Sequence, residues 1–124
     1  LNSTIRVLNM NIDFERYTYY IRPGVTDMRK GAHALAYIVQ NEMKLDAFSP
    51  SVFIFCGGGR RIMKILLWDM NGWYEITKRI ETQERFSWPM DSEEARNVTL
   101  DDVISFLKGQ NPWTTFHPIF PSYV

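Results

Sequence analysis

VFIFCGGGRRIMKILLWDMNGWYEITKRI, residues 52–80, is the stretch that decides the fold. It holds three apolar runs that are separated by two turn signals. Val52–Cys56 is continuously apolar, which is typical of a buried strand. Ile62–Asp69 is apolar at both alternating sets of positions, so we expect a central strand that is covered on both faces. Trp73–Ile80 alternates between two faces, and an Asn-Gly pair precedes it as a hairpin signal. The stretch therefore predicts an antiparallel meander.

Two further strands are expected on either side of this stretch. Tyr17–Arg22 has the aromatic and β-branched content of a strand, and Pro23 and Gly24 end it. Arg85–Pro89 predicts a short last strand that proline stops, which extends the meander over 52–88.

Two helices are also expected. Apolar residues recur at three- and four-residue spacing from Met28 to Met43, which predicts a helix near 27–44 with Thr26 as its N-cap. A second helix is predicted near 99–108, where Thr99 is the cap and two aspartates occupy the first turn. The order of these elements indicates an α+β fold: a mostly antiparallel β-sheet of about 4–5 strands with helices packed against it.

The length of 124 residues indicates a single domain, 1–124. Residues 1–15 are expected to be an N-terminal arm or an edge strand. Residues 110–124 are expected to be an irregular tail that is rich in aromatics and proline.

Charge and cysteine content limit the function. The chain has 14 Lys and Arg residues and 14 Asp and Glu residues, so its formal net charge is zero. Non-specific binding of DNA by overall charge is therefore not expected, although cations segregated into one local patch stay compatible with this total. Cys56 is the only cysteine, which excludes an internal disulfide and a zinc site made of cysteines. With neither a signal peptide nor a membrane span in the sequence, we expect a cytoplasmic protein.

Catalytic residues are few. His33 and His117 are the only histidines, and Cys56 lies in a very apolar run where a buried, inert thiol is expected. Asp27, Asp69 and Glu75 each have a simpler role than metal binding, in a helix turn, beside a turn or on an exposed strand face. We therefore expect no enzyme, no metal site and no cofactor.

Five cations are candidates for binding phosphate. Arg29 and Lys30 lie at the expected start of the first helix, where an anion is stabilised; the alternative is that Arg29 pairs with Asp27 and Lys30 is solvated. Arg60 and Arg61 either present a hairpin tip to a backbone phosphate or form a plain solvated turn. The glycines before them lack the Lys-Ser/Thr end of a P-loop.

The fifth candidate is Arg79, which shares a strand face with Trp73 and Thr77. Either this face brings a ring and a cation to a nucleic acid, or it is the polar side of an aromatic hairpin.

PGVTDMRKG, followed in order by FIFC, RR, KILLWD, NGWY, KRIE and RFSWP, resembles the TnpB accessory proteins of the IS66 group of bacterial insertion sequences. The resemblance covers roughly residues 17–113. The sequence departs from the family pattern at three places: three glycines at 57–59 replace an arginine-rich hairpin tip, Ile62 replaces a common basic position, and Met70 stands where the turn commonly has glycine.

The resemblance implies an accessory protein of a mobile element that supports transposition, with DNA at the element ends as a partner. It raises the expectation that Arg29 and Lys30 contact a DNA backbone. The alternative is a protein–protein module that binds the transposase or another accessory protein and touches no nucleic acid. In that case Trp113, Phe116 and Phe120 of the tail would carry the contact.

Overall fold

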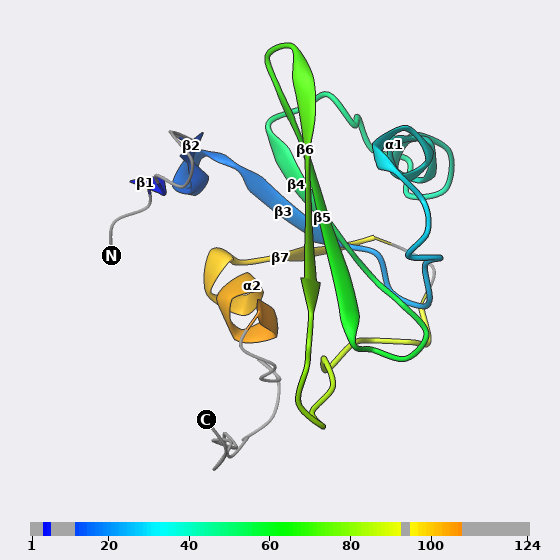
Figure 1. Cartoon of the computed structure of the whole chain (residues 1–124). Coiled ribbons are helices and arrows are strands. Elements are labelled where there is room, and N and C mark those ends of the chain that lie inside the picture. The colour runs from blue at the N-terminus through cyan, green and yellow to red at the C-terminus, as the bar shows by residue number, and fades with distance from the viewer. Residues whose placement is uncertain (1–3, 6–11, 93–94, 108–124) are drawn as a thin grey trace.

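The computed structural model describes residues 4–5, 12–92 and 95–107. Its centre is a five-stranded sheet in the order β6-β5-β4-β3-β7, formed by Gly72–Arg79, Ile62–Asp69, Ser51–Cys56, Thr18–Ile21 and Arg96–Val98. Helix α1 (Ala32–Asn41) covers one face and helix α2 (Leu100–Leu107) covers the other (Figure 1). A small hairpin of β1 (Thr4–Ile5) and β2 (Ile12–Asp13) and a 3₁₀ turn, η1 (Phe14–Arg16), precede β3.

The sheet is mixed, which is compatible with the predicted α+β class. β4, β5 and β6 form the predicted antiparallel meander, and the pairing runs without interruption from Ile62 opposite Arg79 to Asp69 opposite Gly72. β3 pairs with β4 in parallel because α1 carries the chain back between them. β7 pairs antiparallel with β3 at the other edge.

The prediction of a last strand at 85–89 is wrong. The fifth strand is β7, which lies between Pro89 and Thr99, where no strand was expected. Phe86 and Trp88 are buried, at 1% and 6% exposure, but their segment does not pair with a strand. The Trp88 indole N–H donates to the Arg22 carbonyl at 2.9 Å instead. The alternating aromatic residues therefore indicated that this segment is buried on one side. A buried extended loop can have the same pattern as a strand.

The predicted start of the first helix is also wrong. Residues 27–30 form a turn in which the Lys30 N–H donates to the Asp27 carbonyl at 3.2 Å, and α1 begins at Ala32 with Gly31 as its N-cap. Thr26 is no helix cap, because its side chain is buried and its Oγ1 accepts from Arg22 at 3.2 Å.

The second helix follows its prediction. The Asp102 N–H donates to Thr99 Oγ1 at 3.1 Å, and the Thr99 N–H donates to the Asp102 carboxylate at 3.0 Å. This reciprocal pair satisfies amide groups that the first turn of a helix leaves free.

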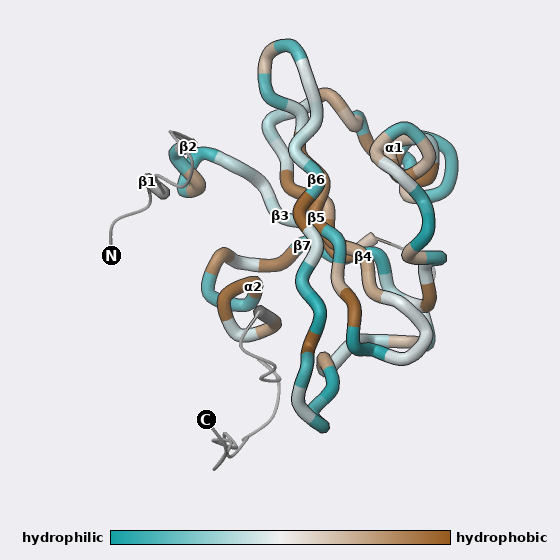
Figure 2. Tube along the Cα trace, in the orientation of Figure 1, coloured by the Kyte–Doolittle hydropathy of each residue, from teal (hydrophilic) through white to brown (hydrophobic). Residues whose placement is uncertain are grey.

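The core lies in two layers, one on each face of the sheet. α1 packs Leu35, Ile38 and Val39 against strand residues such as Phe53 and Leu66. On the other face, α2 packs Val103 and Phe106 against a cluster that includes Phe86 and Trp88. Figure 2 shows the hydrophobic segments gathered where the strands cross the middle of the domain. None of the helices described has the length and apolar character needed to cross a membrane.

Candidate functional site

Three segments that are far apart in the sequence meet at one end of the sheet and enclose a hollow of about 450 Å³. They are the turn before α1, the β4–β5 turn and the last residue of β6. Three arginine residues, Arg29, Arg61 and Arg79, are part of its lining, so we call it the arginine hollow. Its full lining is Val25, Thr26, Asp27, Met28, Arg29, Gly57, Gly58, Gly59, Arg61, Ile62 and Arg79.

The turn before α1 is fastened to the sheet at two points. The Thr26 N–H donates to the carbonyl of Cys56, the last residue of β4, at 2.9 Å. Lys64 of β5 donates from Nζ to the Lys30 carbonyl at 2.8 Å and to the Glu75 carboxylate at 2.7 Å. The Lys64 side chain is only 12% exposed, so this ammonium is a structural clamp. The sequence pattern predicted that Lys64 lies on a covered strand. It did not indicate the hydrogen bond to the Lys30 carbonyl, which is 34 residues away.

The β4–β5 turn requires an unusual backbone. Arg60 has φ of 56°, and its N–H donates to the Gly57 carbonyl at 3.0 Å. Gly57 packs so closely on Met28 that a Cβ at this position would lie 2.7 Å from Met28 Cγ. Position 57 therefore requires a glycine, because the turn before α1 approaches it so closely. In the sequence this requirement was visible only as a run of glycines.

The chain that follows β6, residues 80–89, is bonded to the same turn. Arg61 donates from Nη2 to the carbonyls of Ile80, at 3.2 Å, and Thr82. The Phe86 N–H donates to the Arg60 carbonyl at 2.7 Å. The Arg61 guanidinium thus orders the backbone of residues 80–82, while Arg61 is also among the residues that line the hollow.

The electrostatics of the hollow are set by three guanidinium groups and one carboxylate. Arg29 donates to Asp27 from Nε at 3.0 Å and from Nη2 at 2.8 Å, and its side chain is 91% exposed. These hydrogen bonds hold the pKa of Asp27 well below its usual range and raise the pKa of Arg29. Within the described ranges, no carboxylate lies at ion-pairing distance from Arg79. The lining therefore carries an excess of positive charge.

The structure brings three of the five predicted cations to one place. Arg29, Arg61 and Arg79 line the hollow, whereas Arg60 lies beside it in the turn and Lys30 follows Arg29 in the chain. Arg29 forms the pair with Asp27 that was the alternative interpretation, yet it still lines the hollow. Trp113, Phe116 and Phe120 lie outside the described residues.

An aromatic cluster lies at the opposite end of the β5–β6 hairpin. Trp68 and Trp73 face each other across the two strands, with ring centroids 4.9 Å apart and planes at 69°. Phe48 contacts both rings, at 4.9 and 5.2 Å, and is 54% exposed. Met70 at the tip of the hairpin is 89% exposed. This end of the domain therefore presents apolar surface.

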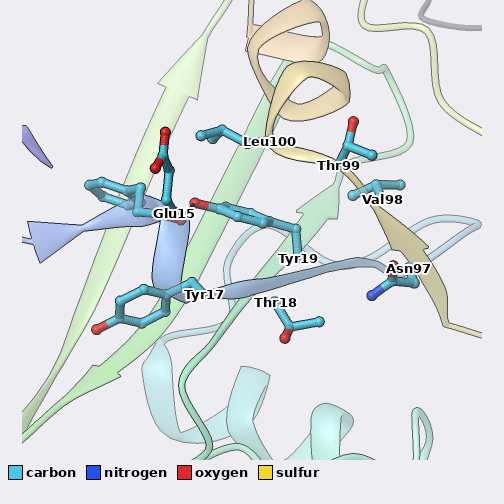
Figure 3. A pocket seen from close by; sticks show the side chains of 9 residues that line it. Glu15, Tyr17, Thr18, Tyr19, Asn97, Val98, Thr99 and Leu100 are labelled. Carbon is cyan, nitrogen blue, oxygen red and sulfur yellow. Dashed lines mark hydrogen bonds between the residues drawn. The ribbon is translucent and has the colours of Figure 1, made fainter. Parts of the chain in front are cut away.

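A second, smaller hollow of about 280 Å³ lies between η1, β3 and the start of α2 (Figure 3). Its lining includes Glu15, Tyr17, Tyr19 and Leu100, and the Tyr19 ring lies across it. The Tyr19 hydroxyl donates to the Phe14 carbonyl, and burial raises the pKa of Tyr19 to about 12. Because this hydroxyl is already bonded and resists ionisation, it is suited to structure and not to proton transfer.

Metal-binding side chains do not gather in the described part of the chain. No group of three His, Cys, Asp or Glu residues there is arranged to hold a metal ion. Cys56 is fully buried, and burial raises the pKa of its thiol to about 12. The thiol is therefore neutral at physiological pH, as its apolar strand predicted.

Two comparisons with known proteins found a match, to a family model and to a relative. The model of the family described as IS66 Orf2-like protein matches residues 17–116. An uncharacterised protein, y4hO, from Sinorhizobium fredii (strain NBRC 101917 / NGR234) is 31% identical over 102 residues, which cover 80% of this chain and 88% of that protein. No solved structure matches the chain.

Proposed function

Because the chain belongs to the IS66 Orf2-like protein family, we propose that it supports transposition of an insertion sequence of the IS66 group by holding DNA phosphates at the arginine hollow. The observation that carries this proposal is the convergence of Arg29, Arg61 and Arg79 on one hollow in a chain whose net charge is zero. A guanidinium is planar and presents forked donors that match a phosphate.

The charges around the hollow set the expected strength of binding. Asp27 neutralises Arg29 in the free protein, so Arg61 and Arg79 supply the net attraction. Binding through two uncompensated cations would be weak and sensitive to salt, because each phosphate that a cation neutralises releases counterions. The contact would fix the position of the protein on DNA and would read no bases.

The test is a salt titration of binding to duplex DNA from an element end. The logarithm of the association constant should fall against the logarithm of salt concentration with a slope of about −2, since each phosphate contact contributes about −0.9. Arg79→Gln should make this slope shallower by about 0.9. Arg61 is unsuitable for the test because it also orders residues 80–82.

The matched control is Lys44→Gln, which removes one exposed positive charge after α1, away from the hollow. It should leave both the slope and the affinity unchanged. Absence of binding at low salt would contradict the proposal, as would equal effects of the two substitutions.

A second candidate function is binding to the transposase without nucleic-acid contact. The aromatic cluster of Phe48 with the half-buried Trp68 and Trp73 favours it, because Phe48 is 54% exposed and exposed aromatic side chains are typical of protein interfaces. Phe48→Ser should then weaken binding to the immobilised transposase of the element and leave DNA binding unchanged. Equal transposase binding by the variant and the parent would count against this surface.

A further inference from the structure

β6 is an edge strand of the five-stranded sheet. All eight of its residues pair one by one with β5, without a bulge or a proline, and none of the described segments lies along its other side (Figure 1). The other edge is β7, which has only three residues. A straight edge of eight residues is a template for another strand.

The hydrogen-bonding direction of β6 follows from one bond beyond its end. The Ile80 N–H donates to the Arg61 carbonyl at 2.8 Å, so even-numbered residues of this strand direct their amides toward β5. The odd-numbered residues direct their N–H and C=O groups outward. They are Trp73, Glu75, Thr77 and Arg79.

We propose that β6 pairs with β6 of a second copy of this chain, antiparallel, about a two-fold axis that passes through Thr77. The outward amides and carbonyls of Glu75, Thr77 and Arg79 then meet their counterparts in hydrogen-bonded pairs. Glu75 of each copy lies opposite Arg79 of the other copy, so the pairing brings opposite charges together twice. This proposal does not rest on DNA binding.

The charges select this register over its neighbours. An axis at Glu75 places two carboxylates opposite each other, and an axis at Lys78 does the same with two ammonium groups; like charges at such positions are destabilising. An axis at Ile76 places Glu75 opposite Thr77 and forms no ion pair. Of these axes, only the one at Thr77 places both charged residues of this face, Glu75 and Arg79, opposite a residue of the opposite charge.

The opposite face of the strand fits the same register. Tyr74 lies opposite Ile80 of the second copy, twice, and Ile76 lies opposite the aliphatic stem of Lys78. Ile76 is 39% exposed in the single chain, although it is a large apolar side chain in a strand. Pairing would cover it. Because the contact is two-fold, it uses the β6 edge of both copies and closes, so it predicts a dimer and not a fibre.

Sedimentation equilibrium of the full chain over a wide concentration range tests the pairing. We expect a reversible monomer–dimer equilibrium. Thr77→Pro removes an N–H that points away from β5, so it should leave the monomer folded and abolish the dimer. Thr77→Val, which keeps the N–H, is the matched control and should dimerise like the parent.

A charge exchange tests the register. Arg79→Glu should raise the dimer dissociation constant about tenfold, because it turns two attractive pairs into two repulsive ones. Glu75→Arg should raise it as well, but this substitution also removes the acceptor of Lys64 within the chain, so the Tm of the variant is measured first. An equimolar mixture of the two variants should restore dimer formation, since opposite charges then face each other at both positions again.

Three results would overturn the proposal. The first is a monomer at every concentration, and the second is a Thr77→Pro variant that still dimerises. The third is hydrogen-exchange protection of the Glu75, Thr77 and Arg79 amides that does not change with concentration, because a segment of the same chain would then cover the edge.

Discussion

Met70→Gly is expected to stabilise the protein. Met70 is the first residue of the two-residue turn between β5 and β6, and its φ is 54°. The Asn71 N–H donates to the Asp69 carbonyl at 2.5 Å, so Met70 is the central residue of a γ-turn with positive φ. The left-handed region costs a residue with a Cβ about 1–2 kcal/mol. This strain is a physical reason for the glycine that the family resembled by this sequence commonly has at this position.

The magnitude follows from two opposing terms. Glycine removes the strain of about 1–2 kcal/mol but loses about 0.5–1 kcal/mol of backbone entropy on folding. Met70 is 89% exposed, so its side chain contributes almost no packing that could be lost. The net gain is about 0.5–1 kcal/mol, which corresponds to a rise in Tm of about 2–4 °C for a domain of this size. Thermal unfolding followed by circular dichroism measures it.

Two variants make the test specific to the backbone. Met70→Ala removes the side chain and keeps the strain, so its Tm should stay near that of the parent. Asn71→Gly should lower Tm, because Asn71 does not have a positive φ and gains nothing from glycine. A Tm of Met70→Gly at or below that of Met70→Ala would refute the reasoning.

Three further predictions concern the residues that hold the fold together. Lys64→Met should lower the free energy of unfolding by about 2 kcal/mol in urea titrations, because it removes two charge-assisted hydrogen bonds from a side chain that is 12% exposed. Gly57→Ala should cost about 1–3 kcal/mol by overpacking against Met28, and combining it with Met28→Ala should cost less than the sum of the two single changes. Cys56 and Tyr19, whose pKa values burial raises from 9.0 and 10.0 to about 12, stay protonated in the folded chain, so their contribution to stability should be constant below about pH 9 and be lost as pH rises toward 12. Thiol labelling at pH 8 should likewise require denaturant, and rapid labelling of the folded chain would contradict the assignment.

Periodic patterns predicted the parts of the fold that pack by a regular repeat. The meander was visible because apolar residues fill β4 and both alternating sets of positions of β5, which is the signature of a covered strand. The start of α2 was visible because Thr99 and Asp102 bond to each other within one turn. Both signals are local, so a single sequence contains them.

The parallel pairing of β3 with β4 was not predicted, because it depends on where α1 returns the chain. The site was predicted only in part for a similar reason. Arg29, Arg61 and Arg79 were candidates, but their meeting depends on the clamp from Lys64 to the Lys30 carbonyl and on the contact of Gly57 with Met28. Such contacts join residues that are 29 or more positions apart. A single sequence does not show which distant residue each of them contacts.

The two wrong predictions about local structure fall at the same end of the domain. The helix was expected to begin at 27, and a strand was expected at 85–89; both segments instead bond to other parts of the chain. The Thr26 N–H bonds to Cys56, the Gly24 N–H bonds to Pro89 at 2.8 Å, and the Phe86 N–H bonds to Arg60. Sequence rules for regular elements fail where the backbone serves a junction, and such failures are expected at functional sites.

The residues that carry the family resemblance therefore divide into two groups with different experimental meaning. Lys64, Arg61 and Trp88 donate to backbone carbonyls, so substitutions there report on folding before they report on a ligand. Arg79 lines the arginine hollow with no described carboxylate within ion-pairing distance, and Arg29 is 91% exposed. A loss of transposition caused by Arg79→Gln in a chain with unchanged Tm and unchanged self-association would thus locate the function at the hollow, whereas the same loss caused by Lys64→Met would not.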